Sequence, residues 1–265
     1  MQALEGGREG RIWRDGDTVT RPAGPWTPTV HRFLAHIRAA GFDGAPLPIA
    51  ITEAGQEIVS FVEGRVSENL GDPVTGSERM LRSAGELLAK FHAASRGFLE
   101  SDRQPQVWML EPRAPRDIVC HGDFAPYNVA GENGVAVGLI DFDTIHPAPA
   151  LWDLAYAVYR WAPLFTTGHQ GGVFDQETQL RRARIFCDAY GATADERRRL
   201  PAMIVERLRA LVAFMRGRAE AGDETFVEDV EAGEAALYLA DIAHMDRLGE
   251  RLGEALLGSC SHASA

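Results

Sequence analysis

Three polar side chains in the middle of the chain have types and spacing suited to chemistry. Asp123 follows a short apolar strand pattern at 118–120, and Asn128 lies five positions after it. Asp141 ends a second apolar stretch at 135–140. The glycine-containing turn between Asn128 and that stretch predicts a hairpin, whose strands are antiparallel. We therefore expect Asp123, Asn128 and Asp141 to lie within one small volume.

These three groups suit the transfer of a phosphoryl group. A carboxylate and an amide oxygen are ligands that Mg²⁺ prefers, because this ion takes oxygen ligands and relies on substrate phosphates for others. A second carboxylate that is free of metal can accept a proton from an attacking hydroxyl. Each residue alone also fits a plain structural role, such as an Asx turn at Asn128 or a loop cap at Asp141. Their joint spacing favours the chemical interpretation.

The first 65 residues predict a small, strand-rich unit. A hairpin is expected at 12–21, because Asp15-Gly16 between strand-like runs favours a tight turn. A helix is expected from Thr27 to Ala40, where apolar residues recur on one face. Two further strands are expected at 47–52 and 57–62.

Helical patterns dominate the rest of the chain. Thr75 to Glu78 reads as a capping box that opens a helix. Pro201 must then sit in the first turn of a later helix or kink it. Further helices are expected at 152–161, 204–215 and 237–256. The expected fold is α+β with two lobes, a β-rich lobe at 1–65 and a larger helical lobe at 66–265.

Composition limits the possible functions. The chain has 265 residues, is 45% hydrophobic and carries a net charge of −11. The apolar content excludes global disorder, and the negative charge disfavours binding to nucleic acid. No apolar run is long enough for a membrane span, and residues 1–10 do not resemble a secretory signal. Three widely separated cysteines do not predict disulfides or a zinc site, so a cytoplasmic location is expected.

The negative charge is concentrated in the second part of the chain. Residues 66–265 contain 20 basic and 30 acidic residues, and the run from Glu220 to Glu234 has acidic residues with no basic residue among them. One interpretation is a solvated helix face. The other is a surface that attracts a cationic ligand.

The central segment resembles the aminoglycoside phosphotransferase and choline kinase superfamily, small-molecule kinases with a protein-kinase-like fold. The resemblance rests on His121-Gly-Asp123 followed by Asn128, on an apolar strand ending in Ile140-Asp141, and on Trp152-Asp153-Leu154-Ala155. It extends over nearly the whole chain and is strongest at 118–160. It implies a nucleotide bound between the two lobes.

The resemblance also implies a role for each matching residue. Asp123 would be the catalytic base, and Asn128 and Asp141 would hold Mg²⁺. His121 and Asp153 would brace the catalytic loop. The other expected contributors are the backbone of Ser60 and Val62, which would bond adenine at the hinge, and Asp143, which would assist the metal or the acceptor or merely cap a loop.

Two features depart from the superfamily pattern. Its third strand usually carries a lysine paired with a glutamate of the next helix, but here Arg21 is the only basic candidate. The helix expected at 27–40 contains no acidic residue, so the ion pair is expected to be missing. The glycine-rich element is reduced to Gly6-Gly7 and Gly10. We therefore expect Arg21, Gly6 and Gly7 to bind the nucleotide in a way that is atypical of the superfamily.

The resulting functional expectation is an ATP- or GTP-dependent kinase with Mg²⁺, acting on a hydroxyl of a small and cationic molecule. An aminoglycoside-like antibiotic, and hence antibiotic resistance, or an amine metabolite would fit. The segment from Asp141 to Asp153 is too short to be a protein-kinase activation segment, which disfavours a protein substrate. The alternative is a nucleotide-binding pseudokinase with a regulatory role. The sequence leaves the oligomeric state open.

Overall fold

An antiparallel sheet forms the N-terminal part of the molecule in this computed structural model, which describes residues 2–4, 12–166 and 174–258. Its strand order is β1-β2-β3-β5-β4. A tight turn joins β2 to β3, and Gly16 adopts the left-handed conformation there (φ +58°), as the Asp-Gly pair predicts. Gly6, Gly7 and Gly10 lie outside the described residues. The strands are β1 (Gln2–Ala3), β2 (Trp13–Asp15), β3 (Thr18–Pro22), β4 (Pro48–Ile51) and β5 (Gln56–Ser60).

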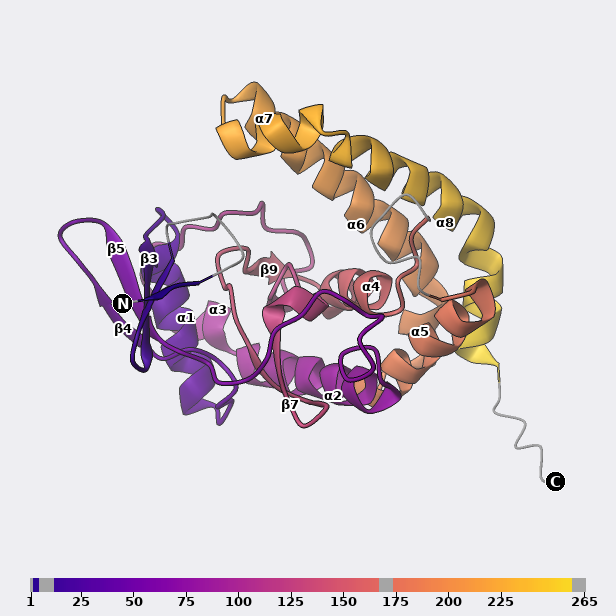
Figure 1. Ribbon diagram of the computed structural model, residues 1–265, viewed down its shortest axis with the longest axis horizontal. Helices are drawn as coiled ribbons and strands as arrows, with labels where there is room; N and C mark the ends of the chain where they lie inside the picture. The colour runs from indigo at the N-terminus through magenta and orange to yellow at the C-terminus, as the bar shows by residue number, and fades with distance from the viewer. Residues whose placement is uncertain (1, 5–11, 167–173, 259–265) are drawn as a thin grey trace.

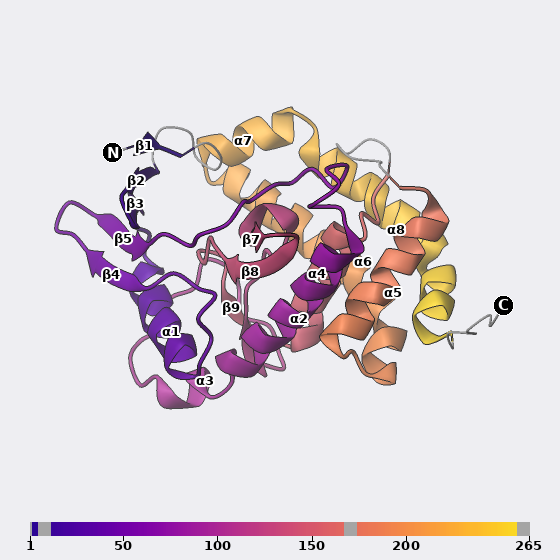
Figure 2. The same cartoon turned by 60° about the horizontal axis from the view of Figure 1, so that its bottom comes forward.

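One helix, α1 (Thr27–Ala39), lies between β3 and β4 in the chain and packs beside this sheet (Figure 2). Its apolar residues recur at helical spacing, and Val30, Phe33 and Ile37 are buried. Pro28 sits in its first turn, where a missing N–H has no cost. The strand-rich lobe with one helix is therefore as predicted.

Helices make up most of the remaining chain (Figure 1). Two short antiparallel ladders, β6 with β9 and β7 with β8, lie among these helices, and the segment 121–128, predicted to be the catalytic loop, connects β6 to β7. The elements are α2 (Glu78–Ser95), α3 (Phe98–Ser101), β6 (Ile118–Cys120), the 3₁₀ turn η1 (Pro126–Asn128), β7 (Val129–Glu132), β8 (Val135–Leu139), β9 (His146–Ala148), α4 (Ala150–Trp161), α5 (Gln176–Tyr190), α6 (Ala194–Glu220), α7 (Glu224–Glu231) and α8 (Glu234–Leu257).

Two local predictions in this part were wrong. The residue that caps α2 is Ser77, whose hydroxyl accepts a hydrogen bond from the backbone N–H of Met80, so the expected box starting at Thr75 does not form. Pro201 lies in the interior of α6, well past its first turn, and the helix continues as one element from 194 to 220. Within the described ranges, none of the helices is long and apolar enough to cross a membrane.

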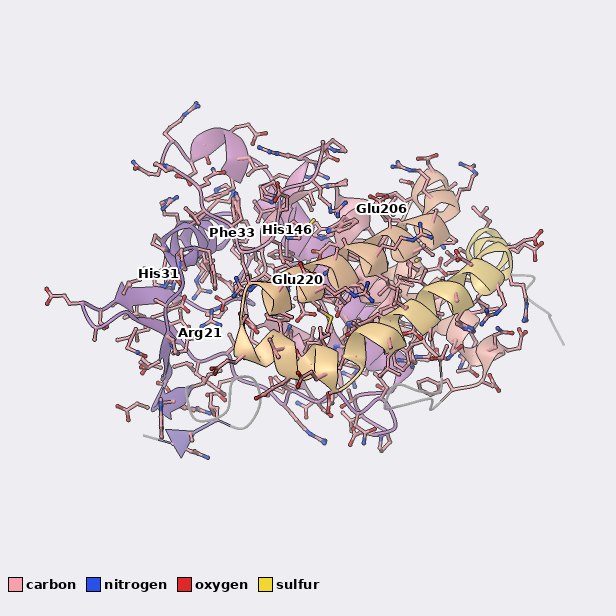
Figure 3. The ribbon with its side chains drawn as sticks, turned by 90° about the horizontal axis from the view of Figure 1, so that it is seen from above. Arg21, His31, Phe33, His146, Glu206 and Glu220 are labelled. Carbon is pink, nitrogen blue, oxygen red and sulfur yellow. The ribbon has the colours of Figure 1, made fainter. Side chains whose placement is uncertain are left out.

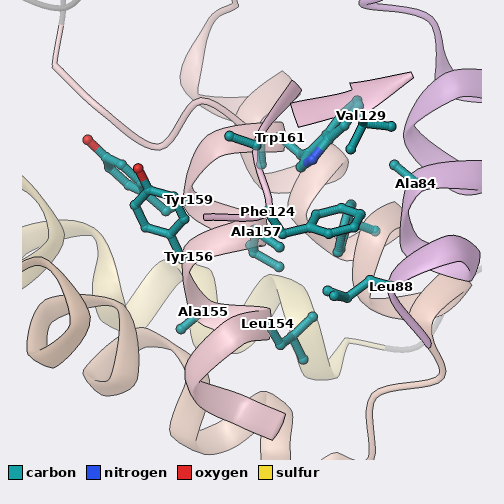
Figure 4. Close-up of a cluster of buried hydrophobic side chains, with 14 of the residues drawn as sticks. Ala84, Leu88, Phe124, Val129, Leu154, Ala155, Tyr156, Ala157, Tyr159 and Trp161 are labelled. Carbon is teal, nitrogen blue, oxygen red and sulfur yellow. The ribbon is translucent and has the colours of Figure 1, made fainter. Parts of the chain in front are cut away.

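The hydrophobic core gathers around α2 and α4 (Figure 4). Phe124 lies in it together with Leu88 of α2 and Leu154 of α4, and all three side chains are fully buried. Tyr156 and Tyr159 of α4 turn their hydroxyl groups away from this cluster. The helix α4 thus packs into the core on one side and presents polar groups on another.

Phe91 of α2 joins the two lobes. Its buried ring lies 6.0 Å from the ring of Phe33 in α1, and 6.0 and 6.1 Å from those of His121 and Phe142 beside the catalytic loop. We expect Phe91→Ala to lower the free energy of unfolding by about 3–5 kcal/mol, because the cavity would open at the point where both lobes meet. Urea denaturation would measure this. The exposed Val107→Ala is the control, and an equal, small effect in both variants would contradict the assignment.

Candidate active site

The hairpin of β7 and β8 brings the three predicted polar residues together. The side-chain amide of Asn128 donates to Asp123 Oδ2 at 2.9 Å, and the backbone N–H of Ile140 donates to the Asn128 carbonyl at 3.0 Å. Asp141 follows Ile140 directly, so the end of β8 lies against the catalytic loop. The antiparallel pairing was predicted from the turn and is confirmed.

Asp123 is less exposed than Asp141, and it lines a cavity. Its Oδ1 accepts a hydrogen bond of 2.7 Å from the hydroxyl of Tyr127. Burial raises the pKa of Asp123 above its ordinary value, while the Tyr127 hydrogen bond and the nearby His121 act against that rise. A carboxylate with a raised pKa accepts a proton more readily than an exposed one.

Asp153 holds the backbone of the loop that carries Asp123. Its two carboxylate oxygens accept the N–H groups of His121 at 2.7 Å and Gly122 at 2.9 Å, and His92 adds a contact of 3.0 Å. Burial would raise the pKa of Asp153, but these hydrogen bonds and the neighbouring histidines lower it to about 2. Gly122 has φ +82°, and a Cβ there would lie 2.4 Å from the Thr144 carbonyl oxygen, so only glycine fits.

His121 itself points away from solvent. Its Nε2 lies 3.1 Å from the carbonyl oxygen of Ile140, and its ring stacks edge-on against Phe142 at 5.0 Å. The side chain is fully buried. It therefore links the loop before Asp123 to the segment that carries Asp141.

Asp141 and Asp143 both form ion pairs with the same side chain, that of Arg21. Arg21 of β3 donates to Asp141 Oδ1 at 3.0 Å and to Asp143 Oδ1 at 2.9 Å. Asp141 has φ +60°, a conformation that non-glycine residues rarely adopt, and its side chain remains half exposed. Burial raises the pKa of Asp143, and the nearby positive charge of Arg21 acts to lower it.

Arg21 has a carboxylate partner in the N-terminal lobe that the sequence analysis did not predict. Arg21 Nε donates to Glu57 Oε2 at 2.5 Å, and His31 Nε2 lies 3.0 Å from Glu57 Oε1. The carboxylate comes from β5 and not from α1, which supplies His31 instead. Burial would raise the pKa of Glu57, but the hydrogen bonds from His31 and Arg21 hold it below its usual value. Figure 3 labels Arg21 and His31 on the side of the small sheet.

The donor set at this place fits a hard divalent cation. Asp141 and Asp143 offer carboxylate oxygens, and Asn128 offers an amide next to them. Both carboxylates form ion pairs with Arg21, whose positive charge partly neutralises them. A bound divalent cation would neutralise them in the same way. Among the described residues, no group of three or more His, Cys, Asp or Glu side chains is arranged for a metal, so bound phosphate and water would have to complete the ligands.

The expected hinge residues lie at the end of β5, where Ser60 is its last residue, and just after it, at Val62. The backbone N–H of Ser60 donates to the Leu47 carbonyl at 2.9 Å, and its hydroxyl accepts from the Leu47 N–H at 2.8 Å. The N–H of Ser60 is thus engaged inside the sheet. Val62 makes no backbone hydrogen bond with any other residue that the structure describes. Arg65 pairs with Gly131 of β7, which ties the end of the hinge segment to the helical lobe.

A cavity of about 550 Å³ opens beside Asp123, a volume typical of small-molecule sites. Asp123 and Tyr127 lie at its catalytic-loop wall. Of the acidic run that was noted in the sequence, Asp229 lines the cavity together with Glu234, while Glu224 and Glu228 do not. The cavity also has aromatic walls, formed by Trp152, Tyr156, Phe214, Phe226 and Tyr238.

Several site residues were missed at the sequence level. Tyr127 lies inside the motif, and its spacing from Asp123 was a usable signal. Glu57 lies in a predicted strand, with a charged side chain turned to a buried face. Arg113 and Arg207, which also line the cavity, carry no local signal, because only the tertiary fold brings them to Asp123.

The solved structures show the class of fold, which is two-lobed and protein-kinase-like. A choline/ethanolamine kinase family protein from Mesorhizobium loti superposes with a TM-score of 0.61 over 94% of this chain and 89% of that one, at 14% identity. The amicoumacin kinase hAmiN, solved with AMP-PNP, Ca²⁺ and Ami, superposes with a TM-score of 0.63 over 93% of this chain and 88% of that one, at 11% identity. The GDP and kanamycin complex of APH(2")-IIia superposes with a TM-score of 0.55 over 94% of this chain and 93% of that one, at 13% identity.

The sequence comparisons agree with this class. Residues 102–201 match the model of the family described as "Phosphotransferase enzyme family". The trifolitoxin immunity protein of Rhizobium leguminosarum bv. trifolii is 29% identical over 204 residues, which are 73% of this chain and 75% of that protein. The predicted resemblance to aminoglycoside phosphotransferases and choline kinases is therefore confirmed.

The bracing of the catalytic loop by Asp153 can be tested through stability. We expect Asp153→Asn to lower the free energy of unfolding by about 3 kcal/mol at neutral pH, because it breaks a buried, charged hydrogen-bond network. The folded-state pKa of about 2 lies below the ordinary value of 3.8. The loss should therefore be full above pH 4 and shrink as the pH falls towards 2.

Chemical denaturation of both proteins at several pH values measures this difference. The exposed pair partner Asp195 provides the control variant Asp195→Asn. A difference between wild type and Asp153→Asn that does not change below pH 4 would contradict the low pKa.

Proposed function

We propose that the protein transfers the γ-phosphoryl group of ATP or GTP to a hydroxyl group of a small molecule. The observation that carries this proposal is the half-buried Asp123 carboxylate, with its raised pKa, at the wall of a cavity and next to the Asp141 segment. Phosphoryl transfer needs few covalent steps from the protein, so a correctly placed base and a neutralised phosphate supply most of the catalysis.

Asp123 is the proposed base. An acceptor hydroxyl bound in the cavity would donate its hydrogen bond to the carboxylate, and the proton would move there as the hydroxyl oxygen attacks phosphorus. Tyr127 and Asn128 each donate to one oxygen of Asp123, which fixes the orientation of the carboxylate. Asp153 and Gly122 fix the backbone beneath it.

The nucleotide is proposed to lie between the lobes. Mg²⁺ held by Asp141 and Asn128, with Asp143 nearby, would neutralise the phosphate charge. Arg21 is placed by Glu57 to reach the same region, and a guanidinium binds phosphate through two parallel hydrogen bonds. Gly6 and Gly7 remain proposed contacts to the nucleotide. The backbone of Val62 and the carbonyl of Ser60 are proposed to bond the base.

The acceptor is proposed to carry an amine near Asp229 and Glu234, because these carboxylates line the cavity that Asp123 faces. Aromatic walls beside them also favour a cation. The similarity to a trifolitoxin immunity protein supports a protective role, in which phosphorylation inactivates a toxic compound.

A regulatory pseudokinase is the second candidate. It was favoured by the missing lysine–glutamate pair, and the Arg21–Glu57 contact weakens that reason because it supplies another ion pair. The kinase proposal is therefore the stronger one.

The roles of the two central aspartates can be separated by binding. We expect Asp141→Ala to abolish Mg²⁺-dependent binding of ATP or GTP, because the carboxylate that holds the ion is lost. Asp123→Ala should bind the nucleotide like the wild type but reduce phosphate transfer by at least about a thousandfold. Isothermal titration with and without Mg²⁺, followed by an ADP-release assay, distinguishes the two. Equal loss of nucleotide binding in both variants would show that the roles are wrong.

The acidic side of the cavity gives a second prediction. We expect the double variant Asp229→Asn/Glu234→Gln to raise KM for an amine-bearing acceptor about tenfold and to leave KM for the nucleotide unchanged. The matched control is Glu224→Gln/Glu228→Gln, which removes two charges of the same run outside the cavity. Steady-state kinetics at low and high salt provide the measurement. Similar kinetics for both double variants would leave the acidic run as a solvated face.

A further inference from the structure

The cavity beside Asp123 has a basic end as well as an acidic one. Arg113, from the connection before β6, places its guanidinium 3.9 Å from the ring centre of Trp152, and Arg207 of α6 lies 5.4 Å from the same ring. All three residues line the cavity. His146 and Glu206, which flank this end, are labelled in Figure 3. The fold thus brings two cations together on one indole ring.

Arg207 is the more unusual of the two. Only 5% of it is exposed, yet in the described part of the chain no carboxylate lies within salt-bridge distance of its guanidinium. One terminal nitrogen donates to the Gly122 carbonyl at 2.6 Å, and Nε is buried with no partner among the described residues. Its guanidinium stacks on Tyr156 at 4.5 Å. A buried charge is costly unless another charge or several hydrogen bonds compensate it.

Arg113 increases the positive charge at this place. Its single ion pair in the described structure is with Glu206 at 3.2 Å, and that carboxylate is exposed on α6. Burial and the nearby charge of Arg207 lower the pKa of Arg113, while Glu206 and Glu111 act in the opposite direction. Two guanidinium groups that repel each other at the wall of a cavity are an arrangement suited to bind an anion.

We propose that Arg113 and Arg207 bind a carboxylate of the acceptor, so that the acceptor is a zwitterionic hydroxy compound. Its hydroxyl would face Asp123, its amine would face Asp229 and Glu234, and its carboxylate would lie on the two arginines. The identification of the bound molecule as the acceptor rests on the proposed kinase function. The anion site itself rests on the arginines alone.

The anion site can be tested without knowing the acceptor. Benzoate, benzyl alcohol and benzylamine have the same ring and similar size but differ in charge, and all fit an aromatic-walled cavity. We expect benzoate to bind the wild type at least about tenfold more tightly than benzyl alcohol, as a charge-assisted contact allows. Arg113→Gln and Arg207→Lys should each weaken benzoate binding, and Glu206→Gln should leave it equal or tighter, since it releases Arg113. Isothermal titration measures all of these.

The control variant is Arg199→Gln, which removes an exposed arginine of the same helix that pairs with Asp195. Because Arg207 also holds the loop at Gly122, the decisive variant is Arg113→Gln, whose thermal stability should equal that of the wild type. Benzoate that binds no better than benzyl alcohol, or that binds Arg113→Gln and Arg199→Gln equally, would overturn the proposal. Inorganic phosphate is titrated in parallel. If it binds these arginines and benzoate does not, the site serves phosphate and the carboxylate assignment is wrong.

The acceptor assignment is tested with matched pairs that differ by one carboxylate: L-serine and ethanolamine, L-homoserine and 3-amino-1-propanol, L-tyrosine and tyramine. With MgATP or MgGTP, we expect more transfer to the carboxylate-bearing member, and we expect Arg113→Gln to remove that preference. Transfer that favours the simple amines would refute the zwitterion while the kinase function stands. Binding of benzoate at the arginines without nucleotide binding or transfer would refute the kinase function while the anion site stands.

Discussion

The guanidinium of Arg21 joins the two lobes at the place where phosphate is expected. It is held by Glu57 within the small sheet and contacts Asp141 and Asp143 of the helical lobe. Three carboxylates raise its pKa despite its burial, so it stays charged at any relevant pH. The lobes therefore have a fixed electrostatic contact beside the half-exposed Asp141. A nucleotide with Mg²⁺, as proposed above, would bring both negative and positive charge to this contact, so that the pairs could rearrange without leaving a carboxylate unpaired.

A second buried charge, that of Asp153, fixes the loop on the other side of the site. Its carboxylate is used entirely inside the protein and never meets a substrate. The two aspartates of the motif region thus differ because of their surroundings. Asp153 receives several N–H groups and has a low pKa, whereas burial keeps the pKa of Asp123 raised at the edge of a cavity. The loop is thus held by hydrogen bonds to Asp153 on one side and borders the cavity at Asp123.

Much of this arrangement could be predicted from the sequence, because it depends on local patterns. The hairpin turn at Gly16, the helix after Thr27 and the strands around Asn128 and Asp141 all have periodicity or turn residues that are read directly. The cap of α2 was misplaced by two residues, since several polar residues in that stretch can serve as caps. The partner of Arg21 could not be predicted, because pairing across a sheet depends on register and on which face is buried.

The same reasoning explains why the sequence indicated only one part of the cavity lining. The acidic run from Glu220 to Glu234 is contiguous and easily seen, and it suggested a cationic ligand. The arginines that face it come from separate segments, so their proximity appears only in the folded chain. A net charge of −11 therefore says little about the ligand of one cavity, where the local groups decide. Since Arg207 is buried without a carboxylate partner in the described structure, the basic end of the cavity is where an anionic group would compensate a buried charge, although the cavity as a whole is also lined by carboxylates.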